Sequence, residues 1–351
     1  MGQNCTQHAD CSAIQRFFQS YLDEHWPQQG AVTFSNLQSL TSGWETDIYT
    51  FDLFDDTAVA SKKLVMRVYS SQKDAPKALR EFHTMRLLAQ TDFPVPSVYL
   101  LDASGTYLSK PFLVMDYIPG QNLRDLISDQ PHQLRELLGL FCRMFVDLHD
   151  WDWRPHGELL TRIGFQTQWV NPAAELSQML NRWSGITKTG FQSAFNWLRL
   201  NLPQGLMQTF CLNHGDLHPG NILMREGKEP YLIDWGGARL QDFRVDLAWS
   251  MLLLGTYGPG ELRDLVLKQY EAESKRTVTN IEWFEALASL KRLIEVYVFV
   301  SKGVQELGMR QDAVDMMKSD LPHLTGTYGI FKNRTGLRLS VIDQFLDKLH
   351  K

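Results

Sequence analysis

A short polar loop at residues 212–224, LNHGDLHPGNILM, carries the side chains best suited to do chemistry. It places His214, Asp216, His218 and Asn221 within eight positions, with glycine and proline between them and apolar residues on both sides. An aspartate on such a loop could orient a substrate hydroxyl and accept its proton. The two histidines, four residues apart, could instead indicate zinc. Aspartate and asparagine are also ordinary turn formers, so the loop alone leaves these alternatives open.

A second stretch, LIDWG at residues 232–236, follows the loop after a short polar link. The apolar segments NILM and YLIDW on either side of the link can pair as a β-hairpin. Pairing would bring Asn221, at the entry of the first strand, near Asp234, at the exit of the second. An amide oxygen and a carboxylate suit Mg²⁺, with water and substrate phosphates completing the coordination. This combination of an aspartate, an asparagine five residues later and a strand-ending aspartate is typical of phosphoryl transfer.

The elements that must position these residues begin with a part of the chain that is rich in strands. Residues 12–26 predict an amphipathic helix. Two strands are expected within 32–54, on either side of the turn TSGWET, and KLVMRVY at 63–69 predicts a third. A helix is expected over 75–90, in which Glu81 lies on a largely apolar stripe. A carboxylate in that position needs a cationic partner.

The rest of the chain is predicted to be mostly helical. A buried strand at 111–120 runs into a Pro-Gly turn, and we place a lobe boundary there. Helices are expected up to His149, over 171–200, from Val245 to Leu254 and through most of 260–351. The expected fold is α+β, with an N-terminal sheet lobe plus helix (1–115) and a mainly helical C-terminal lobe (116–351). The hinge between them is placed near 115–120.

Composition sets broad limits on function. With 351 residues, of which 44% are hydrophobic and 21% charged, the chain reads as an ordinary globular protein with two domains or lobes. The net charge of -5 gives no basic field for nucleic acid or an anionic membrane. No CxxC pair and no apolar run of about 18–20 residues occurs, so we expect a reduced, cytoplasmic protein without a spanning helix. The start, MGQNCT, matches a myristoylation pattern, which we interpret as coincidence.

Taken together, these segments resemble the aminoglycoside phosphotransferase and choline kinase family of small-molecule kinases. The matching motifs are HGDLHPGNIL, LIDWGGAR, RVDLAW, LVMRVY, LREFHTMRLL, FPVPSVY, LVMDYIPG and FVDLHDWDW, which extend from about residue 35 to 255. The resemblance implies a bilobal, protein-kinase-like fold. It also implies transfer of the γ-phosphate of ATP, with Mg²⁺, to a hydroxyl of an aminoglycoside-like compound, an aminoalcohol or another metabolite. GTP could replace ATP.

The resemblance assigns a role to each residue of the polar loop and its neighbours. Asp216 would be the catalytic base, and Asn221 and Asp234 would bind Mg²⁺. His214 would brace the loop through hydrogen bonds. Asp246, at the start of a buried helix, would anchor the backbone of the loop.

The nucleotide site implied by the resemblance lies in the N-terminal lobe. Arg67 would contact the phosphates and pair with Glu81, although protein kinases have lysine at this position. Backbone amides near Gly43 would cover the phosphates, although TSGWETD lacks a G-x-G-x-x-G pattern. Met115 to Tyr117 would form the hinge that meets adenine. The expected contacts in full are Gly43, Trp44, Glu45, Thr46, Val65, Arg67, Glu81, Met115, Asp116, Tyr117, Leu223 and Ile233.

Several alternatives stay open at this point. His218 could contact the transferring phosphate or form a local hydrogen bond in the turn. A protein kinase is disfavoured because the segment between Asp234 and Asp246 leaves no room for a long activation loop and contains no A-P-E motif. A catalytically weak pseudokinase or scaffold is disfavoured by the intact polar loop. No motif between 150 and 200 identifies the acceptor, and the chain could be a monomer or a homodimer.

Overall fold

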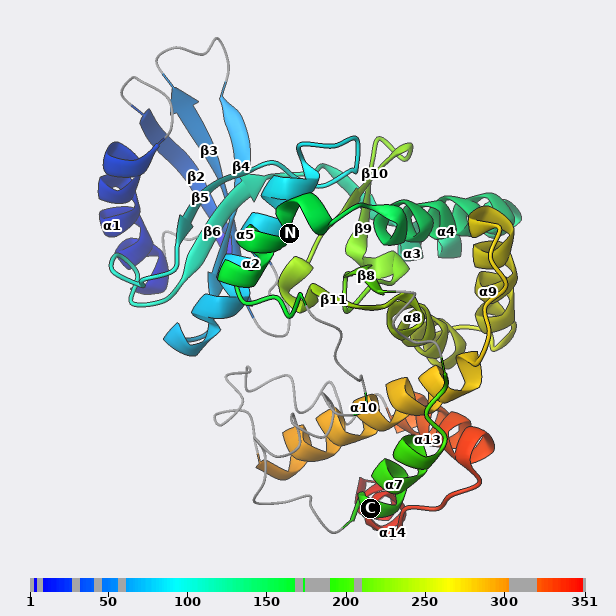
Figure 1. Ribbon diagram of the computed structural model, residues 1–351. Helices are drawn as coiled ribbons and strands as arrows, with labels where there is room; N and C mark the ends of the chain where they lie inside the picture. The colour runs from blue at the N-terminus through cyan, green and yellow to red at the C-terminus, as the bar shows by residue number, and fades with distance from the viewer. Residues whose placement is uncertain are drawn as a thin grey trace. The chain divides into compact units, whose positions relative to one another are not determined.

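The computed structural model describes residues 3–4, 9–26, 32–40, 46–55, 61–167, 173, 190–204, 210–302 and 321–349. The predicted phosphate-covering residues Gly43, Trp44 and Glu45, and most of the helical stretch expected at 171–200, lie outside this part of the chain. The chain divides into two compact units, which are Met1–Asn122 with Ile222–Gly237 and Leu123–Asn221 with Ala238–Lys351. Figure 1 shows the helices and strands of both.

The first unit is built on an antiparallel sheet whose six strands have the order β1-β2-β3-β4-β6-β5. The strands are β1 (Gln3–Asn4), β2 (Val32–Leu40), β3 (Thr46–Asp55), β4 (Lys62–Tyr69), β5 (Val98–Asp102) and β6 (Phe112–Asp116). The predicted strands at 32–54 and 63–69 are therefore confirmed. The amphipathic helix α1 (Ala9–His25) packs its apolar face on this sheet. Phe18 of α1 makes edge-to-face contacts with Phe51 and Phe112, with ring centroids 5.2 and 5.9 Å apart.

A second helix of this unit carries the glutamate that was expected to need a cation. α2 (Ala75–Leu88) follows a 3₁₀ turn, η2 (Gln72–Asp74), in which the carboxylate of Asp74 accepts the backbone N–H of Ser71 at 3.0 Å. The helix buries Ala78, Met85 and Leu88 along one stripe. Glu81 lies on the same stripe and is completely buried. The helix predicted over 75–90 is confirmed to within two residues.

The predicted β-hairpin is also present. β9 (Ile222–Arg225) pairs with β10 (Glu229–Leu232) so that Ile222 lies opposite Leu232. Glu226 and Gly227, with φ of 52° and 70°, turn the chain between them as a tight hairpin requires. β10 ends earlier than YLIDW suggested, because the short 3₁₀ turn η7 (Trp235–Gly237) follows almost at once.

The hairpin groups with the first unit, whereas the lobe boundary predicted from sequence assigned it to residues 116–351. β9 pairs with β7 (Gly120–Asn122) in a three-stranded sheet, and the backbone N–H of Leu232 donates to the carbonyl of Pro94 at 2.9 Å. Inside η7, the buried Trp235 packs edge-to-face on Phe93. These hydrogen bonds and ring contacts join the hairpin to segments that precede residue 122.

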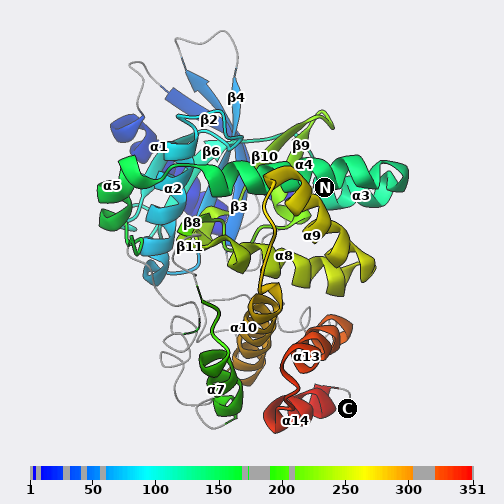
Figure 2. The same cartoon turned by 45° about the vertical axis from the view of Figure 1, so that its right-hand side comes forward.

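The second unit is mainly helical. Its helices are α3 (Leu123–Asp129), α4 (Leu134–Asp150), α5 (Gly157–Arg162), α7 (Gln192–Leu200), α8 (Phe243–Tyr257), α9 (Glu261–Ser274), α10 (Ile281–Lys302), α13 (Leu321–Thr335) and α14 (Ser340–Leu349). Two short strands, β8 (Phe210–Asn213) and β11 (Arg239–Asp242), pair antiparallel. The apolar helix predicted at 245–254 is α8, which packs against α9, α10 and β8 (Figure 2).

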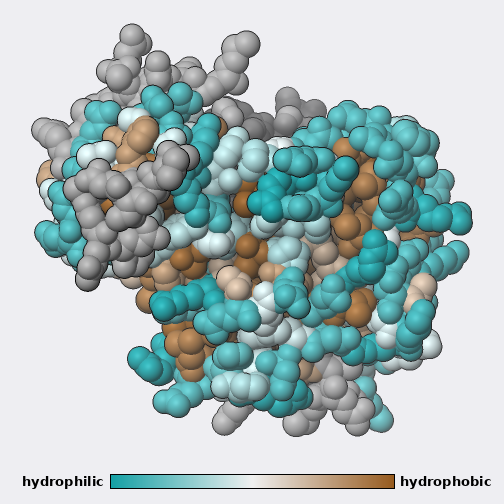
Figure 3. Space-filling model, turned by 90° about the horizontal axis from the view of Figure 1, so that it is seen from above, coloured by the Kyte–Doolittle hydropathy of each residue, from teal (hydrophilic) through white to brown (hydrophobic). Residues whose placement is uncertain are grey.

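The side chains on the surface follow the usual division between polar and apolar. Hydrophilic residues cover most of the described surface on the face shown in Figure 3, and hydrophobic residues appear there only in limited patches. Within the part of the chain that the structure describes, no helix is both long enough and apolar enough to cross a bilayer.

Candidate active site

The polar loop begins where β8 ends and is tied to the start of α8. The carboxylate of Asp246 accepts the backbone N–H groups of His214 and Gly215 at 2.6 and 2.7 Å. Gly215 has a φ of 87°, a conformation that glycine adopts without strain. Burial alone would raise the pKa of Asp246, but His149, His214 and the Gly215 amide outweigh it and hold the pKa below its ordinary value. The anchoring contact expected of Asp246 is therefore present.

Asp216 presents a carboxylate that is both held and reachable. Its Oδ1 accepts the indole N–H of Trp249 at 2.7 Å. Asn221 donates its amide N–H to the backbone carbonyl of Asp216 at 2.8 Å, with a longer contact of 3.4 Å to Oδ2. The side chain of Asp216 keeps 43% of its surface exposed. A fixed and partly exposed carboxylate is what a general base needs.

The two histidines of the loop differ in their surroundings. His214 is fully buried, and its Nδ1 accepts the backbone N–H of Asp216 at 3.3 Å. His218 is partly exposed. Its Nδ1 accepts the N–H of Gly220 at 3.0 Å, and its Nε2 lies 3.8 Å from Oδ2 of Asp216. Both rings thus accept hydrogen bonds from turn amides, and among the described residues no group of three or more His, Cys, Asp or Glu is arranged to hold a metal.

The first unit contains a buried charge cluster centred on Arg67 of β4. One guanidinium nitrogen donates to Glu81 at 2.9 Å, and another donates to Asp234 at 2.8 Å. Glu81 also accepts the hydroxyl of Tyr69 at 2.5 Å. Burial opposes the charge of Arg67, but Asp234 and Glu81 outweigh it and raise its pKa. Arg67 is therefore the cation that Glu81 needs on its apolar stripe. Asp234 is a second partner of Arg67, which the sequence did not predict.

Asp234 adopts an unusual backbone conformation. Its φ is 68°, in the left-handed region that non-glycine residues seldom occupy, and such residues cluster at functional sites. Trp235 follows it fully buried, with its indole N–H donating to the carbonyl of Leu232 at 3.0 Å. This packing fixes the turn, while the side chain of Asp234 retains 38% exposure.

The other residues expected at the nucleotide lie along the sheet of the first unit. Thr46 is buried at the start of β3, and Val65 pairs with Met115 between β4 and β6. The side chain of Asp116, at the end of β6, accepts hydrogen bonds from Tyr99 at 2.8 Å and is 3.0 Å from the ammonium of Lys62. Three further positions lie beyond β6 and in or beside the hairpin, namely Tyr117, Leu223 and Ile233.

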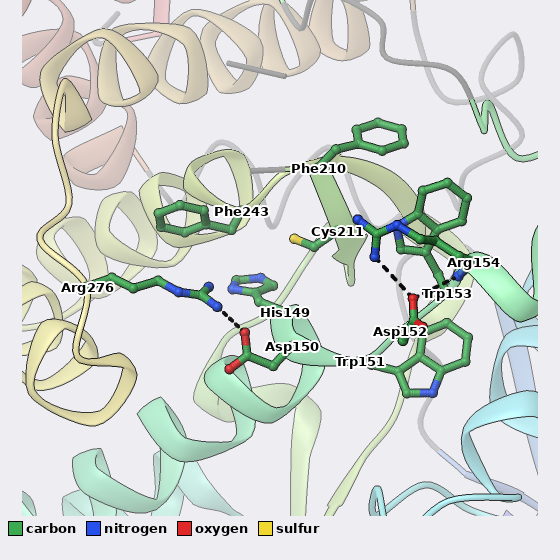
Figure 4. Close-up of a pocket in the computed structure, with 10 residues that line it drawn as sticks. All are labelled: His149, Asp150, Trp151, Asp152, Trp153, Arg154, Phe210, Cys211, Phe243 and Arg276. Carbon is green, nitrogen blue, oxygen red and sulfur yellow. Dashed lines mark hydrogen bonds and ion pairs between the residues drawn. The ribbon is translucent and has the colours of Figure 1, made fainter. Parts of the chain in front are cut away.

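A separate hollow of about 340 Å³ lies in the second unit at the start of β8 (Figure 4). Four of the residues that line it come from the DWDW segment (150–153), which begins with the last residue of α4. Both acids of that segment face arginines, since Asp150 pairs with Arg276 and Asp152 with Arg154. Both acids that line the hollow are thus paired with arginines of the same chain, and the hollow is lined by none of the residues expected at the active site.

Comparison with known proteins gives the family. The model of the phosphotransferase enzyme family matches residues 36–284. Mouse acyl-CoA dehydrogenase family member 10 is 30% identical over 209 residues, which are 55% of this chain but only 18% of that protein.

Solved structures share the fold. A candidate aminoglycoside phosphotransferase from Ralstonia eutropha has a TM-score of 0.64 and 18% identity, covering 91% of this chain and 98% of its own. A thermostable mutant of the aminoglycoside phosphotransferase APH(4)-Ia, in complex with ADP and hygromycin B, has a TM-score of 0.61 and 15% identity, with coverage of 91% and 98%. The chain belongs to the phosphotransferase enzyme family and has a protein-kinase-like α+β fold.

Proposed function

We propose that the chain transfers the γ-phosphate of ATP to a hydroxyl group of a small molecule, with Asp216 as the general base. The observation that carries this proposal is the state of the Asp216 side chain. Its carboxylate is held at Oδ1 by Trp249, and Asn221 holds its backbone carbonyl, yet the side chain remains 43% exposed. Phosphoryl transfer asks for little covalent chemistry from a protein and depends on positioning and charge. A carboxylate held in this way can align an acceptor hydroxyl and take its proton.

Arg67 is proposed to bind the phosphates of the nucleotide. Its guanidinium is buried and fixed by two carboxylates, so little conformational freedom remains to be lost when a phosphate binds. Its Nε is also buried and has no hydrogen-bond partner among the described residues. Such a donor is costly to leave unpaired, and a phosphate oxygen would satisfy it. The side chain of Asp116 is engaged with Tyr99 and Lys62, and the backbone N–H groups of Asp116 and Tyr117 donate to Ser97 and Lys63. We therefore propose that the hinge contacts adenine through a backbone carbonyl.

Asn221 and Asp234 are the residues proposed to hold Mg²⁺. Their donor atoms suit the ion, because a carboxylate and an amide oxygen are hard ligands and both side chains are partly exposed. Asn221 uses its amide nitrogen to bind Asp216, so its oxygen is the atom oriented for a ligand. Bound Mg²⁺ would neutralise charge on the phosphate oxygens.

The acceptor is proposed to be a polar small molecule with a free hydroxyl, as in the related kinase that binds hygromycin B. The direct test is a coupled assay with ATP or GTP and Mg²⁺ against aminoglycosides, macrolides, choline, ethanolamine, homoserine and sugars. Asp216→Asn should lower the turnover of any acceptor by about 10²–10⁴-fold, the usual contribution of a general base, while ATP binding persists. Asp152→Asn, at an acid with 61% side-chain exposure, is the matched control and should turn over normally.

Two results would count against this function. If the wild-type chain phosphorylates no hydroxyl compound but still binds ATP, the alternative of a nucleotide-binding scaffold is favoured. If Asp216→Asn keeps wild-type turnover, another residue must take the proton.

A further inference from the structure

Three polar side chains on α8 hold successive residues of the catalytic loop. Asp246, Trp249 and Ser250 have the spacing i, i+3 and i+4, which places them on one face of the helix. Asp246 accepts the first two backbone N–H groups of the segment 214–217, Trp249 donates to the carboxylate of its third residue, and Ser250 donates to the carbonyl of its last. Of these three side chains, only Trp249 contacts the carboxylate of Asp216, which is proposed to act as the base.

Trp249 is itself held in place. Its side chain is 7% exposed, and its indole N–H lies 2.7 Å from Oδ1 of Asp216. The ammonium of Lys291, on α10, lies 4.2 Å from the centre of its ring, within the range of a cation–π contact. The indole is therefore fixed by contacts with two other elements.

We propose that Trp249 is a positioning residue for the phosphotransfer reaction, an inference that rests on the function proposed for Asp216. A carboxylate whose oxygens are both unrestrained rotates between many orientations. The strong hydrogen bond from Trp249 assigns Oδ1 to the indole, whereas the contact of Asn221 with Oδ2 is long, at 3.4 Å. Oδ2 is thereby the oxygen presented to the acceptor hydroxyl, and the rate of the chemical step depends on this alignment.

The test compares Trp249→Phe with a matched tryptophan of the same unit. Trp283 is similarly buried, at 4% exposure, and its indole N–H donates to the carbonyl of Leu198 at 3.0 Å, outside the catalytic loop. With the best acceptor from the screen, Trp249→Phe should lower kcat by about 10- to 100-fold, the usual effect of losing one hydrogen bond to a charged group. The KM for ATP should stay within about twofold of wild type, and Trp283→Phe should leave kcat unchanged at a similar loss of thermal stability.

A second replacement separates the hydrogen bond from the shape of the ring. Exchanging Trp249 for benzothienylalanine keeps the double ring and removes only the N–H donor, so the loss of kcat should persist. If this variant turns over like wild type, the indole only fills space and the proposal is wrong. Asp216→Asn in the same assay distinguishes the two levels of inference. If Asp216→Asn loses transfer but Trp249→Phe does not, only the positioning role fails; if Asp216→Asn retains transfer, the proposed function itself fails.

Discussion

Replacing Asp246 by asparagine should destabilise the second unit strongly, because this carboxylate is buried and both of its oxygens accept backbone hydrogen bonds. It is 1% exposed and accepts two short backbone hydrogen bonds from the catalytic loop. The buried ring of His149 lies 3.8 Å from the same carboxylate. An amide of the same size would lose the charge and would point its NH₂ group at a backbone donor.

The expected loss of stability follows from these contacts. Hydrogen bonds to a charged group contribute about 1.5–3 kcal/mol each, so losing one, weakening the other and leaving a backbone N–H unpaired would together cost about 3–5 kcal/mol. For a domain of this size each kcal/mol lowers Tm by about 2–4 °C, so Tm should fall by about 6–20 °C.

The effect should also depend on pH in one direction. The pKa of Asp246 is held below its ordinary value in the folded chain, so its ionised form stabilises the fold above the unfolded pKa of about 3.9. This contribution is lost as the pH falls through the lower, folded value. The difference in stability between wild type and Asp246→Asn should therefore be constant near neutral pH and shrink below about pH 4.

Urea unfolding followed by circular dichroism at pH 7 and at pH 3–4 measures both quantities. Asp152→Asn removes a carboxylate that is 61% exposed and should change the free energy of unfolding by less than about 0.5 kcal/mol. A loss below about 1 kcal/mol for Asp246→Asn at pH 7 would refute the reasoning. So would a loss that grows as the solution is acidified.

Two further predictions concern other buried charges. Glu81→Gln removes one of the two carboxylates that fix Arg67. A nucleotide titration should show the affinity for ATP falling about tenfold. An unchanged affinity would mean that Arg67 does not need this partner. Glu285→Gln leaves the arginines Arg263 and Arg334 without the charge that joins them, and the side chain of Glu285 is only 2% exposed. Thermal unfolding should show a loss of about 2–4 kcal/mol in the free energy of unfolding, whereas no change would mean that water compensates the arginines.

Much of the fold could be predicted from local patterns. The strands of the first unit alternate or form short apolar runs, and α4 and α8 carry helical periodicity or continuous apolar sequence. The need of Glu81 for a cation also followed from sequence, because a carboxylate in an apolar stripe is otherwise too costly. The burial of an apolar stripe, and the need of a charge on that stripe for an opposite charge, can both be predicted from sequence.

The second partner of Arg67 could not be predicted in the same way. Asp234 lies 167 residues from Arg67, and it reaches the guanidinium through a left-handed turn at the end of a hairpin. Local propensity carries no signal for such a contact, since non-glycine residues adopt this conformation only when their surroundings require it. The assignment of the hairpin to the first unit depends on the pairing of β9 with β7, which joins segments about 100 residues apart.

Trp249 and Ser250 were missed for a different reason, and the signal for them was present. α8 is largely apolar and buried, and in such a helix a buried polar group must find a partner or be costly to keep. Asp246 was recognised as an anchor, and the polar groups three and four positions later lie on the same face. A loop of irregular backbone has N–H and C=O groups that need partners of their own. A polar stripe on a buried apolar helix therefore predicts a nearby irregular loop, and here that loop carries Asp216.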